Sequence, residues 1–434
     1  MSPIKIHSKK ISGSQPTNSR FVLTLFWVAI LFQLTVLKNI WAIEGLSRFV
    51  NIAVLLSVII YATHSMFSLR FDKNIWAFYI LPGFLVLAGM FFNFALNSIN
   101  NLSVLNYFGT LLPWAFYLVI PALLKKNVYD SKTLWRYFYY FMLTAVILGL
   151  LEYLLVFSGK FSMHMISIPN GEFLAGRFSV LHVLEDGSAY NRFYACFSEP
   201  GTLAMFLLPA IAYAYYHKKY IGLVVFIMGL YLSGSLGGII SVALIIPLFL
   251  FVSTNKHRVS MLISSLVLIL ASSVIVITYM DNIVLRYEEK NESGTFRVDN
   301  FKNTMTKLPS MIVNNPIGFE LAEGTASASK SKYYYGSNFA LGNALQMGGI
   351  SAFLGYLVIL LVSIVAAFLR IIRKNLSLEE KVVYTSLIVL YPFIVQRSTL
   401  WDSAIFAFLF APSIIRFLQS RGDVRTLLSD HPRR

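Results

Sequence analysis

Long apolar runs alternate with short polar connections along almost the whole chain. A helix that crosses a bilayer needs about 20 mainly apolar residues. Apolar segments of this kind occur at 21–37, 48–67, 75–96, 102–124, 134–157, 201–216, 220–233, 235–252, 259–280, 345–369, 382–396 and 402–418. The pattern predicts an all-α polytopic membrane protein, with about twelve transmembrane helices in a single transmembrane domain over residues 1–434.

Two long polar segments interrupt this pattern, at residues 158–201 and 280–345. Within the second, Val298, Phe301, Met305, Leu308 and Ile312 recur at helical spacing, which predicts an amphipathic helix that lies on the membrane surface or acts as a lid. These loops are where a water-soluble group can meet the protein, so their side of the membrane decides what the protein can do.

The distribution of positively charged residues predicts on which side of the membrane the two long loops lie. The chain is 57% hydrophobic and 13% charged, and its net charge is +16. Excess lysine and arginine in membrane proteins collects in cytoplasmic loops. With both termini cytoplasmic, the short outer connections hold only Lys38, Arg48 and Arg397. Both long loops are therefore predicted outside, and nucleic acid is set aside as a partner because no basic soluble domain is present.

Several function classes lose support from what the sequence lacks. The inner loops carry no phosphate-binding glycine motif, no nucleotide-binding pattern and no metal-ligand cluster. ATP-driven work, a metal and an organic cofactor are therefore not expected. The only cysteine is Cys196, so a framework of intrachain disulfides is excluded.

The first loop ends in a carboxylate at the mouth of a span. Glu199 directly precedes Pro200, a residue suited to the first turn of a helix. Glu199 is interpreted either as an N-terminal cap or as a functional group facing the bundle interior. The loop also contains Glu172, Arg177, His182, Glu185, Asp186 and Arg192.

Arginines are the candidates for an anion site in the second loop. Acidic and basic residues balance there, so binding must rest on particular side chains such as Arg286 and Arg297. The guanidinium group matches phosphate geometry and stays charged. Tyr334, within a run of three tyrosines, is a candidate for stacking on sugar rings or an interface aromatic, and Asn338 follows close behind.

Polar residues also occur within and between the spans. Ser233 and Ser235 flank Gly234 in a predicted tight turn, either for close helix packing or for binding phosphate through backbone N–H groups. Asn93, Glu152 and His64 are isolated in apolar segments, which indicates interhelical hydrogen bonds or interface positions.

On this topology, four short motifs resemble those of the Wzy-type bacterial polymerases of O-antigen and exopolysaccharide. They are Ser-Glu-Pro at 198–200, Ser-Gly-Ser at 233–235, Ser-Gly-Thr-Phe-Arg at 293–297, and Ser-Asn followed by Gly-Gly within 337–349. The plan of about a dozen spans with two large periplasmic loops looks similar over the whole chain. The resemblance implies a GT-C-like polymerase/ligase architecture in the bacterial inner membrane.

The implied reaction is metal-independent, inverting glycosyl transfer. A growing chain on undecaprenyl diphosphate moves to the non-reducing end of the next lipid-linked repeat unit, with a chain-length regulator as a possible partner. The departing diphosphate needs preorganised cations, which we assign to Arg297 and Arg192, then Arg177 and Arg286. The acceptor hydroxyl needs a base, with Glu199 first, then His182 and Glu172. The remaining binding candidates are Ser233, Ser235, Asn338 and Tyr334.

Two alternatives stay open. The related O-antigen ligases carry a His-Asn pair near the end of the large periplasmic loop, whereas this chain has Ser337 before Asn338, which favours a polymerase. A flippase for lipid-linked oligosaccharides should place charged residues along its helices, whereas this chain concentrates its polar residues in the outer loops.

Overall fold

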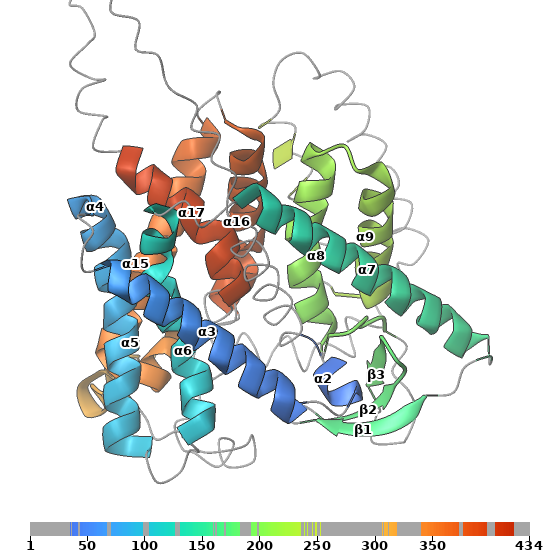
Figure 1. The fold of residues 1–434 in the computed structure, drawn as a ribbon, viewed down its shortest axis with the longest axis horizontal. Coiled ribbons are helices and arrows are strands. Elements are labelled where there is room, and N and C mark those ends of the chain that lie inside the picture. Colours follow the sequence, from blue (N-terminus) through green and yellow to red (C-terminus); the bar gives the residue numbers. More distant parts are fainter. Residues whose placement is uncertain are drawn as a thin grey trace, which may run out of the picture.

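The computed structural model describes most of the apolar part of the chain (Figure 1). The described residues are 35, 37–41, 44–66, 71–98, 104–125, 131–158, 160, 163–168, 171–182, 192–197, 199–235, 340–372, 376–396 and 404–420, with isolated positions and short stretches within 238–252 and 306–318. These residues are mostly helical.

The helices account for most of the described residues. In chain order, those whose bounds the structure gives are α2 (Leu37–Ile40), α3 (Glu44–Met66), α4 (Lys73–Ile75), the π-helix η1 (Trp76–Ile80), α5 (Leu81–Asn93), the π-helix η2 (Phe94–Ser98), α6 (Val104–Lys125), α7 (Ser131–Phe157), α8 (Pro200–Tyr216), α9 (Tyr220–Ser233), α15 (Ala340–Ile372), α16 (Leu378–Gln396) and α17 (Ala404–Ser420).

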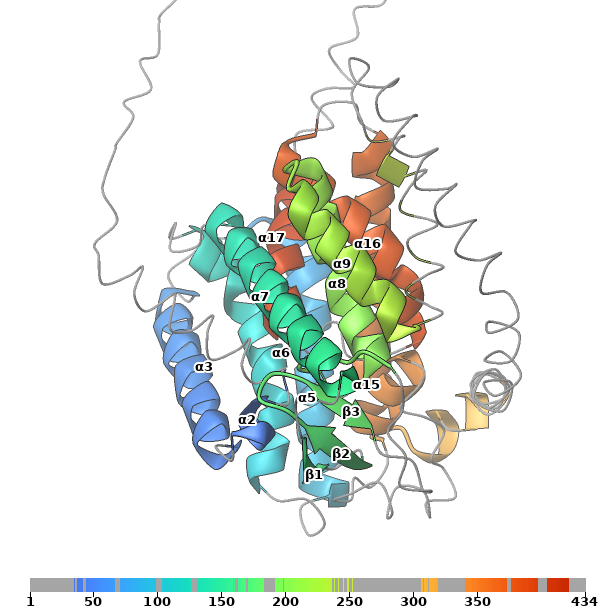
Figure 2. The same ribbon diagram turned by 90° about the vertical axis from the view of Figure 1, so that its right-hand side faces the viewer.

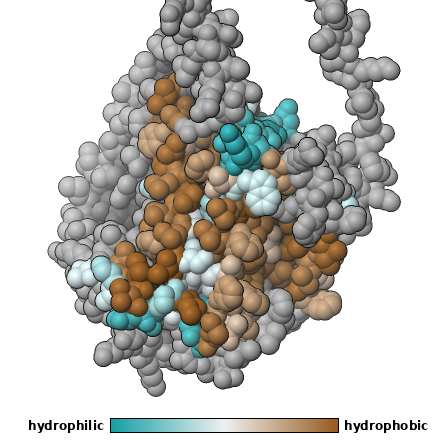
Figure 3. Space-filling model, turned by 90° about the vertical axis from the view of Figure 1, so that its left-hand side faces the viewer, coloured by the Kyte–Doolittle hydropathy of each residue, from teal (hydrophilic) through white to brown (hydrophobic). Residues whose placement is uncertain are grey.

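Within the described part, three helical segments are long and apolar enough to cross a membrane: Lys73–Asn97, Ser131–Val156 and Ala340–Ile372. Hydrophobic side chains also cover much of the described surface on the side shown in Figure 3. Both observations fit a membrane protein.

Every predicted span whose residues are described is a helix. The predicted segments 201–216 and 220–233, for example, match α8 and α9 almost residue for residue. The predicted spans 21–37, 235–252 and 259–280 lie wholly or largely outside the described residues, so the total of twelve crossings stays a prediction.

The helices run alternately up and down. Helices α5, α7 and α9 end, and α6, α8 and α15 begin, at the end of the bundle that carries the strands (Figures 1 and 2). We name this the sheet end and the opposite one the far end. Lys132, Lys218 and Arg370, all predicted to be cytoplasmic, lie at the far end. The alternation agrees with the predicted order of crossings, while the membrane face that each end meets stays a prediction.

A small antiparallel sheet corrects the all-α expectation. Strands β1 (His164–Ile168), β2 (Gly171–Ala175) and β3 (Val180–His182) form a sheet in the order β1-β2-β3, in the loop predicted at 158–201. Ile168 pairs with Gly171 and Ala175 pairs with Val180, so both connections are short hairpins. Short strands paired only with their neighbours leave a weak periodic signal, and the loop's charged residues obscure it.

Small residues set the packing of α5 against α15. A Cβ atom on Gly89 would collide with the carbonyl oxygen of Gly348, and one on Gly355 would collide with the carbonyl oxygen of Pro82. Backbone therefore touches backbone, as in many membrane helix pairs. Beside this contact, Trp114 of α6 lies edge-on to Tyr356 of α15, with ring centroids 5.8 Å apart.

Part of the predicted amphipathic helix is described. Residues 308–310 and 312–314 are helical, and Leu308 and Ile312 pack against Leu345 of α15. Its apolar face is therefore used in part for docking on the first turns of α15. Its remaining residues lie outside the described part.

Candidate functional site

A short loop before α8 joins three elements at the sheet end. The backbone N–H of Phe193 donates to the carbonyl of Leu232 near the end of α9, at 3.1 Å. The carbonyl of Ala195 accepts from the N–H of Val180 at the start of β3, also at 3.1 Å. Residues 193–197 are buried. The loop is therefore fixed between the sheet and the helices.

Backbone strain marks the same loop. Ala195 has a φ of 46°, in the left-handed region that residues other than glycine rarely adopt, at a cost of about 1–3 kcal/mol. A Cβ atom on Gly149 of α7 would lie 3.0 Å from the Cα of Ala195, so α7 holds this conformation by close contact. Arg192 and Glu199 lie on either side of this rigid point.

Glu199 occupies the N-cap position of α8. Its backbone is extended, with φ −144° and ψ 143°, and its carbonyl accepts the N–H of Leu203 at 3.1 Å. The side chain, however, makes no capping hydrogen bond. The interpretation of Glu199 as an N-terminal cap is therefore confirmed for its position in the chain, whereas the side-chain hydrogen bond expected of a cap is not formed. Its carboxylate is partly exposed beside the positive end of the α8 dipole.

Arg177 lies at the tip of the hairpin that joins β2 and β3. Ala175 pairs with Val180, and the N–H of Gly176 donates to the carbonyl of Ser179 at 2.9 Å, which leaves Arg177 and Phe178 as the two-residue tip. The Arg177 side chain is exposed, whereas Arg192 is partly buried. Because Val180 is bonded to Ala195, the hairpin brings Arg177 into the same region as Arg192 and Glu199.

Glu152 of α7 is bonded to this hairpin tip. One carboxylate oxygen accepts the N–H of Arg177 at 2.8 Å, and the other accepts the N–H of Phe178 at 2.9 Å and the hydroxyl of Ser179 at 2.8 Å. The side chain is 7% exposed. The hydrogen bonds seen for Glu152 therefore go to the hairpin and not to another helix, while its interpretation as an interface position stays a prediction. The position of Glu152, an ionisable residue near the end of the apolar span 134–157, was the feature of the sequence that could have indicated this role.

The two serines of the Ser-Gly-Ser motif have structural partners. The Ser233 hydroxyl donates to the carbonyl of Leu230 at 2.6 Å and accepts the N–H of Ser235 at 3.3 Å. The Ser235 hydroxyl accepts the N–H of Gly238 at 3.4 Å. Both serines are buried, and Gly234 has a φ of 56° as the helix C-cap. The motif terminates α9, and these N–H groups are not directed at a phosphate.

Sequence reasoning placed Gly348-Gly349 at the start of a span but did not predict a broken helix there. Gly348 and Gly349 have non-helical angles inside α15. Asn93 of α5 donates from its side-chain amide to the carbonyls of Gln346 (3.2 Å) and Met347 (2.9 Å). The prediction of an interhelical hydrogen-bonding role for Asn93 is confirmed.

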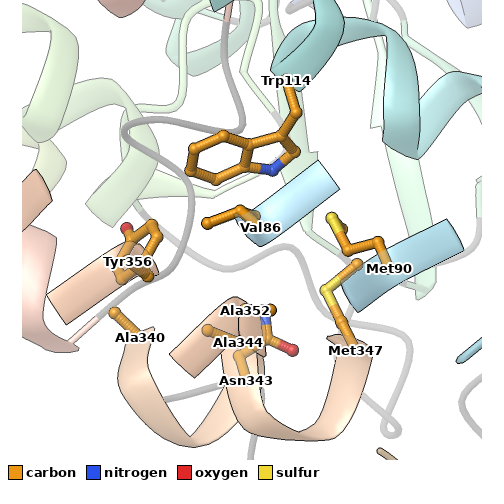
Figure 4. A pocket seen from close by; sticks show the side chains of 9 residues that line it. All are labelled: Val86, Met90, Trp114, Ala340, Asn343, Ala344, Met347, Ala352 and Tyr356. Carbon is orange, nitrogen blue, oxygen red and sulfur yellow. The ribbon is translucent and has the colours of Figure 1, made fainter. Parts of the chain in front are cut away.

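A cavity of ≈ 10 Å³ lies beside this break, with room for about one water molecule. Figure 4 shows Trp114, Val86 and Tyr356 around it, with Met347 and Asn343 from the first turns of α15. The lining is mainly apolar. The cavity is too small to hold a sugar.

The remaining candidates cannot be placed with the others. Arg286, Arg297, Tyr334 and Asn338 lie outside the described residues. Glu172 in β2 and His182 at the end of β3 have described backbones, with Glu172 paired to Ser167 and His182 paired to Phe173. Their assigned roles stay predictions.

Within the described ranges, no group of three or more His, Cys, Asp or Glu side chains is arranged to hold a metal ion. No protein-family model matches the sequence, and no curated protein matches it at a significant level.

Proposed function

We propose that this protein is a membrane glycosyltransferase that polymerises undecaprenyl-diphosphate-linked repeat units, as an O-antigen polymerase does. The proposal comes from the sequence motifs. One observation supports it: hydrogen bonds join the segments that carry Glu199, Arg177 and Arg192 into one region at the sheet end. Arg177 lies three residues before Val180, while Arg192 and Glu199 lie three before and four after Ala195, the partner of Val180.

These three side chains have the chemistry that inverting transfer needs. The acceptor hydroxyl oxygen attacks the anomeric carbon, and the bond from that carbon to the diphosphate oxygen breaks. The diphosphate leaves with the bonding electron pair, and Arg177 and Arg192 stabilise its charge. Glu199 takes the proton of the hydroxyl.

The proposal places the sheet end in the periplasm and the far end, with both termini, in the cytoplasm of a bacterial inner membrane. The lipid tails would lie between helices, with the sugars beneath the outer loops. A cysteine at position 177 tests this orientation, because the native Cys196 is buried and should not react. A membrane-impermeant maleimide should label Arg177→Cys in intact cells. Labelling only after the inner membrane is broken would overturn the orientation.

A lipid-linked oligosaccharide flippase is the second candidate. Discontinuous helices are typical of transporters, and α15 is broken at Gly348 and Gly349. In transporters, such breaks contribute to a substrate site near the middle of the membrane. The cavity described beside this break has room for about one water molecule, so it offers no space for an oligosaccharide, and the order of the sequence motifs is what favours the polymerase.

Lipopolysaccharide gels of a strain that lacks the gene separate the candidates. Loss of a polymerase leaves lipopolysaccharide capped with one repeat unit, and loss of a ligase leaves none. Loss of a flippase traps the lipid-linked unit on the cytoplasmic side. The proposal predicts the single-unit pattern, and either other pattern overturns it.

Complementation with variants then tests the base. Glu199→Gln should give the single-unit pattern at normal protein level, because an amide cannot take the proton. Glu379→Gln is the matched control, since Glu379 lies at the far end, 3.9 Å from Lys132, and it should give full ladders. Full ladders from Glu199→Gln would remove Glu199 from the mechanism.

A further inference from the structure

The tip of the β2–β3 hairpin is held from two sides through its backbone. We propose that Glu152 is a positioning residue, which holds Arg177 where it meets the diphosphate of the lipid-linked substrate. This inference rests on the proposed function and deepens it, because it states how the fold prepares one side of the anion site.

Within the described residues, the hydrogen bonds of the Glu152 carboxylate go to the β2–β3 hairpin. Its two carboxylate oxygens take both N–H groups of the two-residue tip and the hydroxyl of Ser179, all within 2.9 Å. Bonds from N–H groups to a buried carboxylate are stronger than bonds between neutral groups. Because they use the backbone of Arg177, its guanidinium group stays exposed for a ligand.

The conformation of the tip explains why it needs support. Two-residue hairpins favour turns with a positive φ at the first tip residue, or at both, because such turns match the strand twist. Neither Arg177 nor Phe178 has a positive φ. A turn of this kind tends to splay its strands, and the bonds from Glu152 oppose that tendency.

A second contact completes the support. The indole N–H of Trp41 donates to the carbonyl of Arg177 at 3.1 Å, and its ring lies edge-on to Phe178 with centroids 6.2 Å apart. The peptide groups on both sides of the Arg177 Cα are therefore fixed, one by α7 and one by Trp41. Together they determine the direction in which the side chain leaves the backbone.

Gly176 shows how closely the carboxylate fits. A Cβ atom there would collide with Oε2 of Glu152 and lie 2.9 Å from its Cδ. Gly176→Ala should therefore displace the carboxylate while leaving both Glu152 and Arg177 in the chain. It is a second way to release the tip.

The first experiment measures the tip directly. A spin label is placed at 177 (Arg177→Cys) in a Cys196→Ala background, with a control label at His164→Cys, an exposed position on the other edge of the sheet. Glu152→Gln and Gly176→Ala should each increase label mobility at 177 and leave 164 unchanged. Unchanged mobility at 177, or an equal increase at both positions, would overturn the inference.

The second experiment is a double-mutant cycle on the binding of undecaprenyl diphosphate to the purified protein. Arg177→Ala should weaken binding about tenfold or more, as expected for a lost hydrogen bond to a charged group. Glu152→Gln should weaken it about threefold to tenfold in the native protein, and less than about twofold when Arg177 is already alanine. Equal losses in both backgrounds would mean that Glu152 does not act through Arg177.

Controls separate this inference from the proposed function. Glu380→Gln changes a carboxylate at the far end that accepts the N–H of Ser377 and lies 3.7 Å from Arg370. It should leave binding unchanged. Unaltered affinity in Arg177→Ala would overturn the anion site itself, whereas the spin labels report on the support of the tip independently of any activity.

Discussion

Asn93 bridges the break in α15, and its removal has a cost that follows from the structure. In an unbroken helix, the N–H of Ile350 would bond to the carbonyl of Gln346. Here it donates to the carbonyl of Pro316 at 2.9 Å. In place of the Ile350 N–H, the side-chain amide of Asn93 donates to the carbonyl of Gln346, and it also donates to the carbonyl of Met347. Its side-chain oxygen accepts from Asn97 at 2.9 Å, so it connects three segments.

Asn93→Ala leaves two carbonyls without their donor in a site where Asn93 is fully buried. A neutral hydrogen bond contributes about 0.5–1.5 kcal/mol, and an unsatisfied buried group costs about 1–3 kcal/mol. Double-mutant cycles in a membrane protein average about 0.6 kcal/mol per bond. With the bond from Asn97, three bonds are lost, which predicts a loss of about 1.5–4.5 kcal/mol in the free energy of unfolding.

Reversible unfolding of the purified protein in mixed micelles, followed by circular dichroism, measures this loss. Ser363→Ala is the matched control, because the hydrogen bond described for the buried Ser363 goes to Ile359 within α15 itself. The loss of this one bond should cost about 0.6 kcal/mol. Equal losses for Asn93→Ala and Ser363→Ala would refute the argument that Asn93 stabilises the break.

Two further predictions test the break and the far end. Gly349→Ala should destabilise the protein more than Asn93→Ala, because Gly349 has a φ of 62° and an added Cβ would collide with the carbonyl oxygen of Pro316; the same unfolding assay measures it. At the far end, burial lowers the pKa of His217 in the turn after α8, with Lys219 and Lys132 adding to the effect. The folded state then favours the neutral ring, so stability is lost as the pH falls below about 6.5. His217→Gln should reduce this acid sensitivity, measured as unfolding temperature against pH.

The helices were predictable because the length and apolarity of a span are local properties of the chain. Helices α8 and α9 match segments chosen by hydrophobicity alone, and Pro200, the first residue of α8, marked its start correctly. The Gly348-Gly349 pair was visible in the sequence. The break that this pair makes in α15 was not visible, because it is stabilised by a hydrogen bond between Gln346 and Asn93, which are 253 residues apart in the chain.

The sequence identified candidate residues for the site, but it could not predict how those residues are arranged in space. The sequence indicated Glu199 and the arginines of the first loop, and the described fold brings Arg177, Arg192 and Glu199 into one region. The sequence could not show that the Ser233 hydroxyl would accept the N–H of Ser235 and the Ser235 hydroxyl the N–H of Gly238. Hydrogen bonds within a turn depend on backbone angles such as the positive φ of Gly234, which the motif alone does not determine.

Glu152 and Asn93 share a physical role that explains why both occur in apolar helices. A backbone group that leaves regular structure at membrane depth must find a partner within the protein, because lipid offers none. Glu152 supplies acceptors to the N–H groups of a hairpin tip, and Asn93 supplies donors to the carbonyls of a broken helix. Each side chain therefore supplies the type of hydrogen-bonding group, acceptor or donor, that the nearby irregular backbone needs as a partner. A lone acidic residue near the end of a span therefore predicts free N–H groups nearby, and a lone amide predicts free carbonyls. By this rule, the search for substrate-binding side chains belongs on the segments that these residues hold, such as the one carrying Arg177, rather than on the intramembrane residues themselves.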